Sequence, residues 1–207
     1  MEFHSPQEEF WAGEFGQSYI FRNNHEQLLP SAIAFFANIF SSAGILPLTC
    51  LELGANIGIN IRAIQMVSPN TKLSAIEINK EASEILATTG CEVFASSIFN
   101  TQISRQFDFV FSKGVLIHLP PEQLGLTYKK MYDWSKRFIL ISEYYNPEPV
   151  EIDYRGNSGR LFKRDFAGEF MDQYPDVELR DCGFVYHRGV HPQDDITWFL
   201  LEKISVK

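Results

Sequence analysis

Short apolar runs alternate with amphipathic stretches through the middle of the chain. The apolar runs are rich in Leu, Ile, Val and Phe and are bounded by turn residues, which is typical of buried strands. The stretches between them place apolar residues at helical spacing. We expect strands at residues 48–53, 73–78, 92–95, 107–112 and 138–144, and helices at residues 58–67, 79–89 and 121–136. This alternation predicts a Rossmann-like α/β fold, a mostly parallel sheet with helices on both faces.

The N-terminal segment follows a different pattern. Residues 25–43 carry an apolar helical stripe, in which Pro30 either breaks the helix or starts a second one. Upstream, Trp11, Phe15 and Tyr19 recur every four residues, so that one helical face would carry all three. We expect these aromatic residues to form a lid over the site; the alternative is a helix packed on the sheet edge.

The pattern changes again after residue 145. Residues 146–162 are rich in Pro, Gly and charged residues, which predicts an irregular segment. A helix is expected at residues 164–173, and strands at 178–186 and 197–203 should form an antiparallel edge. We therefore expect one domain in four parts: an N-terminal helical and aromatic lid (1–45), a cofactor-binding core (46–145), a substrate-side insert (146–175) and C-terminal strands (176–207).

Charge and composition disfavour several classes of function. The 207 residues carry 18 Lys and Arg against 26 Asp and Glu, and this acidic balance disfavours tight binding to nucleic acid. No run of about 18 apolar residues occurs, so no membrane span is expected. Glu2, Glu8 and Glu9 stand where a signal peptide would be basic, so we expect a cytoplasmic protein. The three cysteines are far apart and form no CxxC pair, which argues against a zinc or redox motif. A small molecule is the expected substrate.

The most informative motif, E-x-G-x-N-x-G at residues 52–58, joins the first strand of the core to the first helix. Gly54 permits a sharp turn and the close approach of a ligand, and Gly58 permits close packing of helix and strand. A dinucleotide fingerprint, G-x-G-x-x-G, would need glycine where the chain has Asn56 and Ile59. Because ligands bind beyond the carboxyl ends of the strands in open α/β sheets, this turn is the expected ligand site.

A second acidic residue, Glu77, ends the second strand of the core. A carboxylate in this place can accept hydrogen bonds from both hydroxyls of a ribose. The alternative is an ordinary surface carboxylate at a strand end. Glu77 alone fits NAD and S-adenosylmethionine equally well; together with the glycine motif it favours S-adenosylmethionine.

The glycine motif resembles motif I of the class I S-adenosylmethionine-dependent methyltransferases, commonly (D/E)-x-G-x-G-x-G, with Asn56 in place of the central glycine. Asn is among the residues that tolerate a left-handed backbone, so the departure is mild. Residues 107–119, FDFVFSKGVLIHL, are similar to the fourth strand and following loop of the family. The resemblance implies a methyltransferase with S-adenosylmethionine as cofactor and S-adenosylhomocysteine as product. The cofactor-binding residues that it implies are Glu52, Gly54, Ala55, Asn56, Gly58, Glu77, Ile78, Ser96, Ser97, Ile98, Lys113 and Gly114.

Two loops of that implied site differ in how closely they follow the family. The family's loop after the third strand holds the adenine, often through an acidic residue, whereas Ser96 and Ser97 stand here. Lys113 and Gly114 begin the loop after the fourth strand, which in the family lies along the methionine part of the cofactor.

A closer resemblance covers nearly the whole chain. The segments FWAGEFGQSYIFRN, YYNPEPVEIDYRG and GRLFKRDFAGEF resemble the methyltransferase family associated with pseudaminic acid biosynthesis. This resemblance implies that the acceptor of the methyl group is a sugar or a nucleotide-activated sugar of surface-glycan biosynthesis.

The substrate side should lie at the ends of the fourth and fifth strands and in the segment that follows. Methyl transfer depends mainly on positioning, and a general base is needed only for a weakly nucleophilic acceptor. The candidate catalytic residues are His118, Glu143 and Tyr144; His118 is alternatively a packing histidine. For substrate binding we expect residues of the long following segment, because long loops in compact domains are often functional: Tyr145, Asn146, Tyr154, Arg155 and Lys163.

Two further groups of residues are of types that bind ligands. Four basic residues gather in the substrate-side insert: Arg155, Arg160, Lys163 and Arg164. They either clamp a phosphate or sugar carboxylate, or pair with nearby acidic residues in solvent. Four potential metal ligands lie near the C-terminus: His187, His191, Asp194 and Asp195. Their spacing is not that of a metal site, so we expect an ordinary loop and no metal.

Two other functions stay open from the sequence. An NAD-linked oxidoreductase would use a similar fold, although the missing dinucleotide fingerprint disfavours it. A non-catalytic protein that binds the cofactor or a partner is the second alternative, because the fold alone does not establish turnover.

Overall fold

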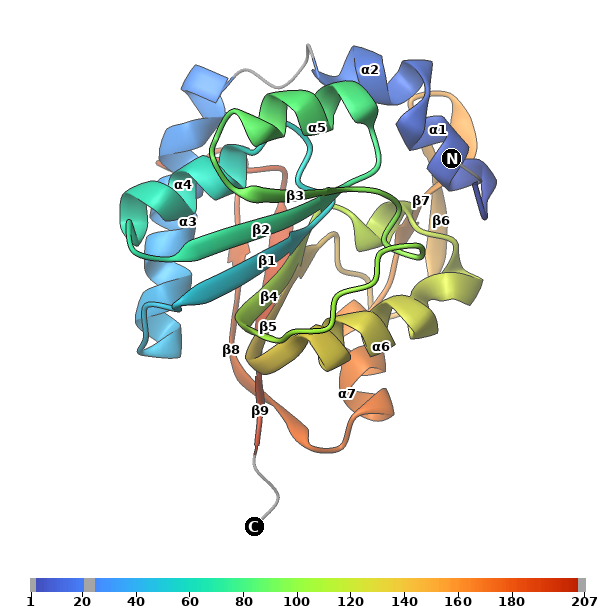
Figure 1. The fold of residues 1–207 in the computed structure, drawn as a ribbon. Helices are drawn as coiled ribbons and strands as arrows, with labels where there is room; N and C mark the ends of the chain where they lie inside the picture. The colour runs from blue at the N-terminus through green and yellow to red at the C-terminus, as the bar shows by residue number, and fades with distance from the viewer. Residues whose placement is uncertain (1–2, 21–24, 205–207) are drawn as a thin grey trace.

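Seven strands form one sheet in the order β3-β2-β1-β4-β5-β9-β8 in the computed structural model, which describes residues 3–20 and 25–204 (Figure 1). The strands are β1 (Thr49–Leu53), β2 (Lys72–Glu77), β3 (Glu92–Ala95), β4 (Phe107–Lys113), β5 (Ser135–Glu143), β8 (Val177–Val185) and β9 (Ile196–Lys203). The first five run parallel, whereas β9 runs antiparallel to both β5 and β8. The predicted fold class is confirmed, and the reversed strand lies one place inside the edge strand.

The chain changes direction across the sheet beside β1. From β1 it moves outward through β2 to β3, and then returns to the other side of β1 with β4. Leu53, the last residue of β1, pairs with Ile76 of β2 on one side and with Ser112 of β4 on the other. Such a reversal leaves a crevice beyond the carboxyl ends of the two central strands.

Helices cover both faces of the sheet. One face packs against α3 (His25–Ala43), α4 (Ile59–Val67) and α5 (Lys80–Ala87), and the other against α6 (Leu124–Trp134) and α7 (Phe166–Gln173). Along β5, Phe138 and Leu140 belong to the first of these cores, whereas Ile139 and Ile141 belong to the second. This alternation follows the period of two of a strand and explains why the strand is apolar throughout.

α3 is a single helix that contains Pro30. Phe36 and Phe40, one helical turn apart, contact Phe111 and Phe109 of β4, with ring centroids 5.2 and 5.4 Å apart. Pro30 therefore neither ends α3 nor starts another helix. Pro30 is the sixth residue of α3, past the four amides that lack intrahelical partners, so the helix continues through it with one backbone hydrogen bond fewer.

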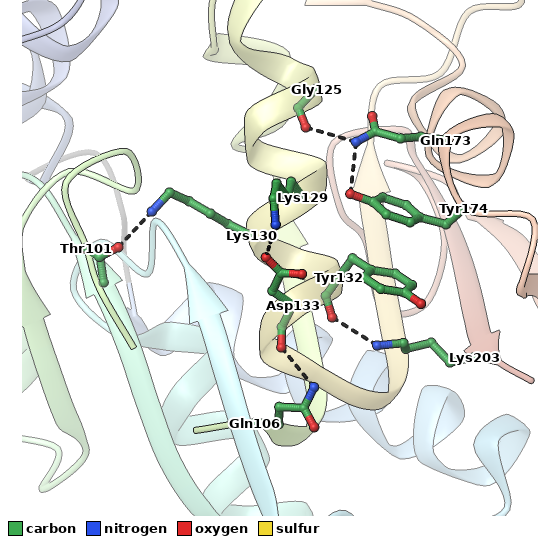
Figure 2. Close-up of polar contacts among 10 residues, drawn as sticks. All are labelled: Thr101, Gln106, Gly125, Lys129, Lys130, Tyr132, Asp133, Gln173, Tyr174 and Lys203. Atoms are coloured by element: carbon green, nitrogen blue, oxygen red, sulfur yellow. Dashed lines mark hydrogen bonds and ion pairs between the residues drawn. The ribbon is translucent and has the colours of Figure 1, made fainter. Parts of the chain in front are cut away.

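The end of α6 is fixed by side chains from neighbouring elements (Figure 2). Lys203 of β9 donates to the carbonyl of Tyr132 over 3.1 Å, and Gln106 donates to the carbonyl of Asp133 over 3.0 Å. The last carbonyls of a helix lack the regular intrahelical donor, so Gln106 satisfies the carbonyl of Asp133, and Lys203 adds a second donor to that of Tyr132, which also accepts from the Ser135 amide.

Two segments differ from the sequence prediction. The helix expected at residues 121–136 begins with a 3-10 turn, Pro121–Gln123, and α6 ends before β5. The segment expected to be irregular contains a hairpin of β6 (Val150–Tyr154) and β7 (Asn157–Lys163). Arg155 and Gly156 both have positive φ, 52° and 80°, as a two-residue type I′ turn requires. Arginine is not a usual residue at the first position of such a turn, so this turn could hardly be predicted from the sequence.

Two short helices precede α3: α1 (Pro6–Ala12) and α2 (Glu14–Ile20). Figure 1 shows α1 beside the β6–β7 hairpin and α2 beside α5, and Gln7 donates to the carbonyl of Gly159 in β7. The N-terminal prediction extends to residues 21–24, which lie outside the described residues. Within the described part of the chain, no helix is long and apolar enough to cross a membrane.

Candidate functional site

The turn after β1 is built from three residues with left-handed backbone. Gly54, Asn56 and Gly58 have φ values of 66°, 49° and 85°. The amides of Gly54 and Ala55 both donate to the carbonyl of Ile76, so the turn stays bonded to the end of β2. Asn56 takes the left-handed conformation that the sequence motif required of it.

Glu77 lies between this turn and the loop that starts α5. One carboxylate oxygen accepts from the backbone amide of Asn56 and the other from that of Asn79, each over 2.7 Å. Burial raises the pKa of Glu77, and these amide donors oppose that rise. The residue is 7% exposed and lines a cavity, so the alternative of an ordinary surface carboxylate is excluded.

A cavity of about 750 Å³ opens at the carboxyl ends of the strands. This volume falls within the usual range of small-molecule sites. The ends of four neighbouring strands contribute its floor: Gly54, Ala55, Asn56 and Ile57 after β1; Ile76, Glu77, Ile78 and Asn79 at β2; Ser96, Ser97, Ile98 and Phe99 after β3; Lys113, Gly114 and Val115 at β4. All the cofactor residues expected from the sequence line this cavity, except Glu52 and Gly58.

Glu52 and Gly58 support the turn from behind. Glu52 is buried, and its Oε1 accepts a hydrogen bond from the side-chain Nδ2 of Asn60 over 2.7 Å, while its Oε2 has no partner among the described residues. Burial raises the pKa of Glu52 to about 7. A β-carbon on Gly58 would lie 2.8 Å from Leu86 Cδ1. This glycine therefore permits the close packing of helix α5, and not that of a strand as the sequence suggested.

Lys113 brings a positive charge to the β4 side of the cavity. Burial lowers the pKa of its ammonium group, while the carboxylates of Glu52, Asp194 and Glu143 oppose that shift. Its Nζ lies 5.7 Å from the centre of the Phe35 ring. A lysine held in this way can bind a carboxylate or phosphate that enters the cavity.

Glu8 of α1 is a cavity residue that the sequence analysis missed. It is 4% exposed, lines the cavity and accepts hydrogen bonds from Ser97 Oγ and from the backbone amide of His4. The contact joins residues far apart in sequence, so no local pattern could have revealed it. The same helix is bonded to the α5 loop, where the Asn79 side chain donates to the carbonyl of Trp11 over 3.1 Å.

His118 lies in the cavity wall between two aromatic rings. The ring centroids of Trp11 and Tyr154 lie 4.7 and 4.9 Å from that of the imidazole. Its Nδ1 lies 2.6 Å from the carbonyl oxygen of Arg160. Because a carbonyl only accepts, Nδ1 carries the proton and Nε2 is left as a proton acceptor. Burial lowers the pKa of His118 to about 4, so the ring is neutral at physiological pH.

Glu143 does not line the cavity, and the prediction that it faces a substrate is corrected. The residue is 2% exposed, at the end of β5. One oxygen accepts from Ser112 Oγ over 2.6 Å and from the amides of Val115 and Leu116, each over 3.1 Å. The other oxygen lies 3.5 Å from the amide of Ile117, so the carboxylate holds the loop after β4 in place and does not face the cavity.

The expected substrate-side residues divide into two groups. Tyr144, Tyr154 and Arg155 line the cavity. Tyr145 and Asn146 lie outside it, and the Tyr145 ring is 40% exposed and packs beside Phe199. This half of the prediction is corrected: Tyr145 directly follows Tyr144, so its side chain points to the other side of the chain, and the Asn146 side chain donates to the carbonyl of Glu148.

The four basic residues of the insert, Arg155, Arg160, Lys163 and Arg164, do not point to a common site. Arg164 forms an ion pair with Glu169 at 2.7 Å, and Arg160 lies over the ring of Phe10 at 5.0 Å. The expected substrate residue Lys163 also lies outside the cavity, with its Nζ 5.2 Å from the Tyr144 ring centre. Of these four cations, Arg155 alone lines the cavity.

The loop between β8 and β9 closes another side of the cavity. His187, Asp194 and Asp195 line it, and His187 Nδ1 lies 2.8 Å from the Asp195 carboxylate. His191 instead lines a separate, smaller pocket beside Trp198. Within the described ranges, no group of three or more His, Cys, Asp or Glu residues is placed to hold a metal ion.

Two of the three aromatic residues expected at the lid reach the cavity, and they come from different helices. Trp11 of α1 and Tyr19 of α2 line the cavity, with ring centroids 5.3 Å apart. The first helix ends at Gly13, so the two residues do not share one helical face. Phe15 packs on Trp11 at 5.4 Å without lining the cavity. The alternative, a helix packed on the sheet edge, does not describe this arrangement.

Comparison with known proteins identifies the fold. No family model matches the chain, and no curated protein does. Among solved structures, magnesium protoporphyrin IX methyltransferase from Synechocystis PCC 6803 with bound S-adenosylmethionine has a TM-score of 0.71 at 10% identity, covering 98% of this chain and 100% of that one.

Two further solved structures are similar. 1,6-Didemethyltoxoflavin-N1-methyltransferase from Burkholderia thailandensis, with bound 1,6-didemethyltoxoflavin and S-adenosylhomocysteine, has a TM-score of 0.71 at 13% identity, covering 99% of this chain and 93% of that one. A plantazolicin methyltransferase in complex with S-adenosylhomocysteine has a TM-score of 0.67 at 12% identity, covering 96% of this chain and 94% of that one. The chain has the class I methyltransferase fold.

Proposed function

We propose that this chain is a methyltransferase that uses S-adenosylmethionine, releases S-adenosylhomocysteine and methylates a small polar metabolite. The observation that carries the proposal is the Glu77 carboxylate, buried and oriented by two backbone amides inside the cavity at the reversal point of the sheet. The likeness to methyltransferases that were crystallised with this cofactor or its product supports the same conclusion.

The residues of the cavity fit an adenosyl cofactor. Each oxygen of Glu77 already accepts one amide and keeps a second lone pair, so the carboxylate can accept from the two hydroxyls of a ribose. Asn56 Oδ1 is a buried acceptor on the cavity wall with no partner among the residues described. Lys113, at the end of β4, supplies the cation that a methionine carboxylate needs.

When bound, S-adenosylmethionine supplies a methyl group already activated on a sulfonium. The protein then has to orient the acceptor in line and remove its proton. We assign the removal of the proton to His118, whose Nε2 is an acceptor in the cavity wall. The proton of an acceptor hydroxyl would pass to Nε2, while the proton on Nδ1 stays bonded to the carbonyl of Arg160.

For the acceptor we propose a sugar or a nucleotide-activated sugar, of the kind used in pseudaminic acid-type surface glycans. Trp11 and Tyr154 flank His118 and offer aromatic faces on which the apolar C–H face of a sugar ring can pack. Arg155, at the tip of the β6–β7 hairpin, adds a cation that can bind a phosphate or carboxylate. The sequence resemblance to the pseudaminic acid-associated methyltransferases supports this choice.

The proposal is tested by measuring methyl transfer to a panel of acceptors: free sugars, nucleotide-activated sugars and planar heterocycles. We expect turnover with activated sugars. His118→Asn keeps a donor for the Arg160 carbonyl and should lower kcat about 10²- to 10⁴-fold, the usual contribution of a general base. His191→Asn, a histidine outside this cavity, is the matched control. Hydride transfer with NAD, or cofactor binding without turnover on any acceptor, would favour the oxidoreductase or the non-catalytic alternative.

A further inference from the structure

We propose that Glu8 of α1 selects the base of the cofactor, by accepting a hydrogen bond from the 6-amino group of adenine. The inference rests on the proposed function and adds a specificity-determining residue from outside the strand-end loops. Three observations carry it: the position of Glu8 along the sheet, the burial of its charge, and the bonds that fix its carboxylate.

The order of the strands places the base of the ligand near Glu8. Glu77 lies at the end of β2, where the ribose is proposed to bind, and Lys113 lies at the end of β4, on the far side of β1. The methionine end of an extended ligand that meets Lys113 must leave its base on the opposite side of Glu77, toward β3. There the cavity wall consists of the loop after β3 and of α1, with Ser97 and Glu8 in contact.

The carboxylate of Glu8 is held in place by hydrogen bonds, and its oxygens can accept further hydrogen bonds from N–H donors of a ligand. It is 4% exposed, and its oxygens accept from Ser97 Oγ and the amide of His4. No ion pair with Lys, Arg or His neutralises it among the described residues. A buried carboxylate is stabilised by further N–H donors, because each oxygen can accept more than one hydrogen bond. The exocyclic amine of adenine is such a donor. A 6-oxo group in its place is a hydrogen-bond acceptor, and the negatively charged carboxylate would repel it.

The position of Glu8 also links the two ends of the cavity. Glu8 and Trp11 are one helical turn apart on α1, and the Trp11 ring lies beside His118. α1 is fixed to the ribose side through Asn79, which donates from its amide side chain to the carbonyl of Trp11 and from its backbone to Glu77. One helix thus supplies a contact to the base of the cofactor and a wall to the acceptor.

Isothermal titration with two ligands tests the proposal: S-adenosylhomocysteine and its deaminated analogue S-inosylhomocysteine, in which an oxo group replaces the amine. We expect the wild-type protein to bind the amino form at least about tenfold more tightly, the magnitude of one charge-assisted hydrogen bond. Glu8→Gln should reduce this ratio about tenfold or more, since its amide can donate to the oxo group. Glu9→Gln, an exposed neighbour on the same helix with the same charge change, should leave the ratio unaltered.

A thermal unfolding curve without ligand establishes that Glu8→Gln is folded. Glu8→Asp, which keeps the charge but shortens the side chain, is a second variant and should also lower the ratio. An equal loss of affinity for both ligands in these variants would mean that Glu8 only positions α1, and would overturn the proposal. If the wild-type protein binds S-adenosylhomocysteine without preferring it, this inference fails alone; if it binds neither ligand, the proposed function fails with it.

Discussion

Val115, in the loop after β4, lies directly against Gly54, in the turn after β1. A β-carbon on Gly54 would come within 2.7 Å of Val115 Cγ2 and 3.0 Å of Cγ1. The two loops that border the reversal point of the sheet are therefore in contact, and neither can be moved without the other. Glu143 holds the second loop by accepting a hydrogen bond from the Val115 amide, so the contact joins the turn after β1 to β5.

Gly54→Ala should weaken binding of S-adenosylhomocysteine at least about 100-fold and destabilise the protein. The alanine must take φ near 66°, which costs about 1–2 kcal/mol, and its methyl group must displace Val115. Gly90→Ala is the matched control, because Gly90 has a φ of 80° and nothing within 4 Å of the added carbon. Titration calorimetry and chemical denaturation check both effects. Unaltered binding in Gly54→Ala would show that the ligand site lies elsewhere.

Glu143→Gln should cost about 1–3 kcal/mol of unfolding free energy, the usual penalty for a buried group left with a poor partner. The amide replaces one acceptor by a donor beside the backbone amides of the β4 loop. Denaturant titration measures the loss, with Glu148→Gln, an exposed glutamate, as control. A variant with unchanged stability but no turnover would restore Glu143 as a catalytic base.

Much of the fold could be predicted because its signals are local. The buried strands are short apolar runs, and residues 54–58 contain the glycines and asparagine that a left-handed turn needs. Glu77 could be placed because a strand end fixes where its side chain emerges. The class of fold and the position of the cavity follow from these features.

The rest depended on contacts between distant segments. Glu8 reaches Ser97 across 89 positions of the sequence, and no periodicity encodes that approach. Glu143 ends a strand that is buried on both faces, so the sequence could not distinguish a residue facing the cavity from one bonded to a neighbouring loop. The β6–β7 hairpin turns at Arg155, which carries none of the usual turn chemistry.

The pH dependence of stability should report the buried imidazole of His118. Its pKa is about 4 in the folded chain against 6.5 for the free side chain, so the unfolded chain binds more protons between these values. Stability is therefore lost as pH falls through this window, by about 2 kcal/mol between pH 7 and pH 5. Denaturant titrations of wild type and His118→Asn measure the difference, which isolates this residue from the carboxylates. Parallel pH profiles for the two proteins would contradict the burial of a neutral His118.

Asn79→Ser should loosen α1 without unfolding α5. Serine retains the N-cap acceptor for the Ala82 amide but loses the donor to the carbonyl of Trp11. Loss of one hydrogen bond, worth about 1 kcal/mol, should speed hydrogen exchange of the α1 amides roughly fivefold. Mass spectrometry of peptides from α1 measures the change, and amides of α4 are the internal control. Exchange that is unchanged in α1 would mean that Asn79 does not fix the helix.

The central claim is that the cavity binds an adenosyl ligand whose ribose is held by Glu77. Titration calorimetry of S-adenosylhomocysteine against wild type and Glu77→Ala tests it most directly, with Glu81→Ala, an exposed glutamate of α5, as control. We predict one site in the wild type and in the control, and a loss of affinity of about 100-fold or more in Glu77→Ala, as expected for two charge-assisted hydrogen bonds. Equal affinity in all three proteins, or no binding to the wild type, would contradict the account.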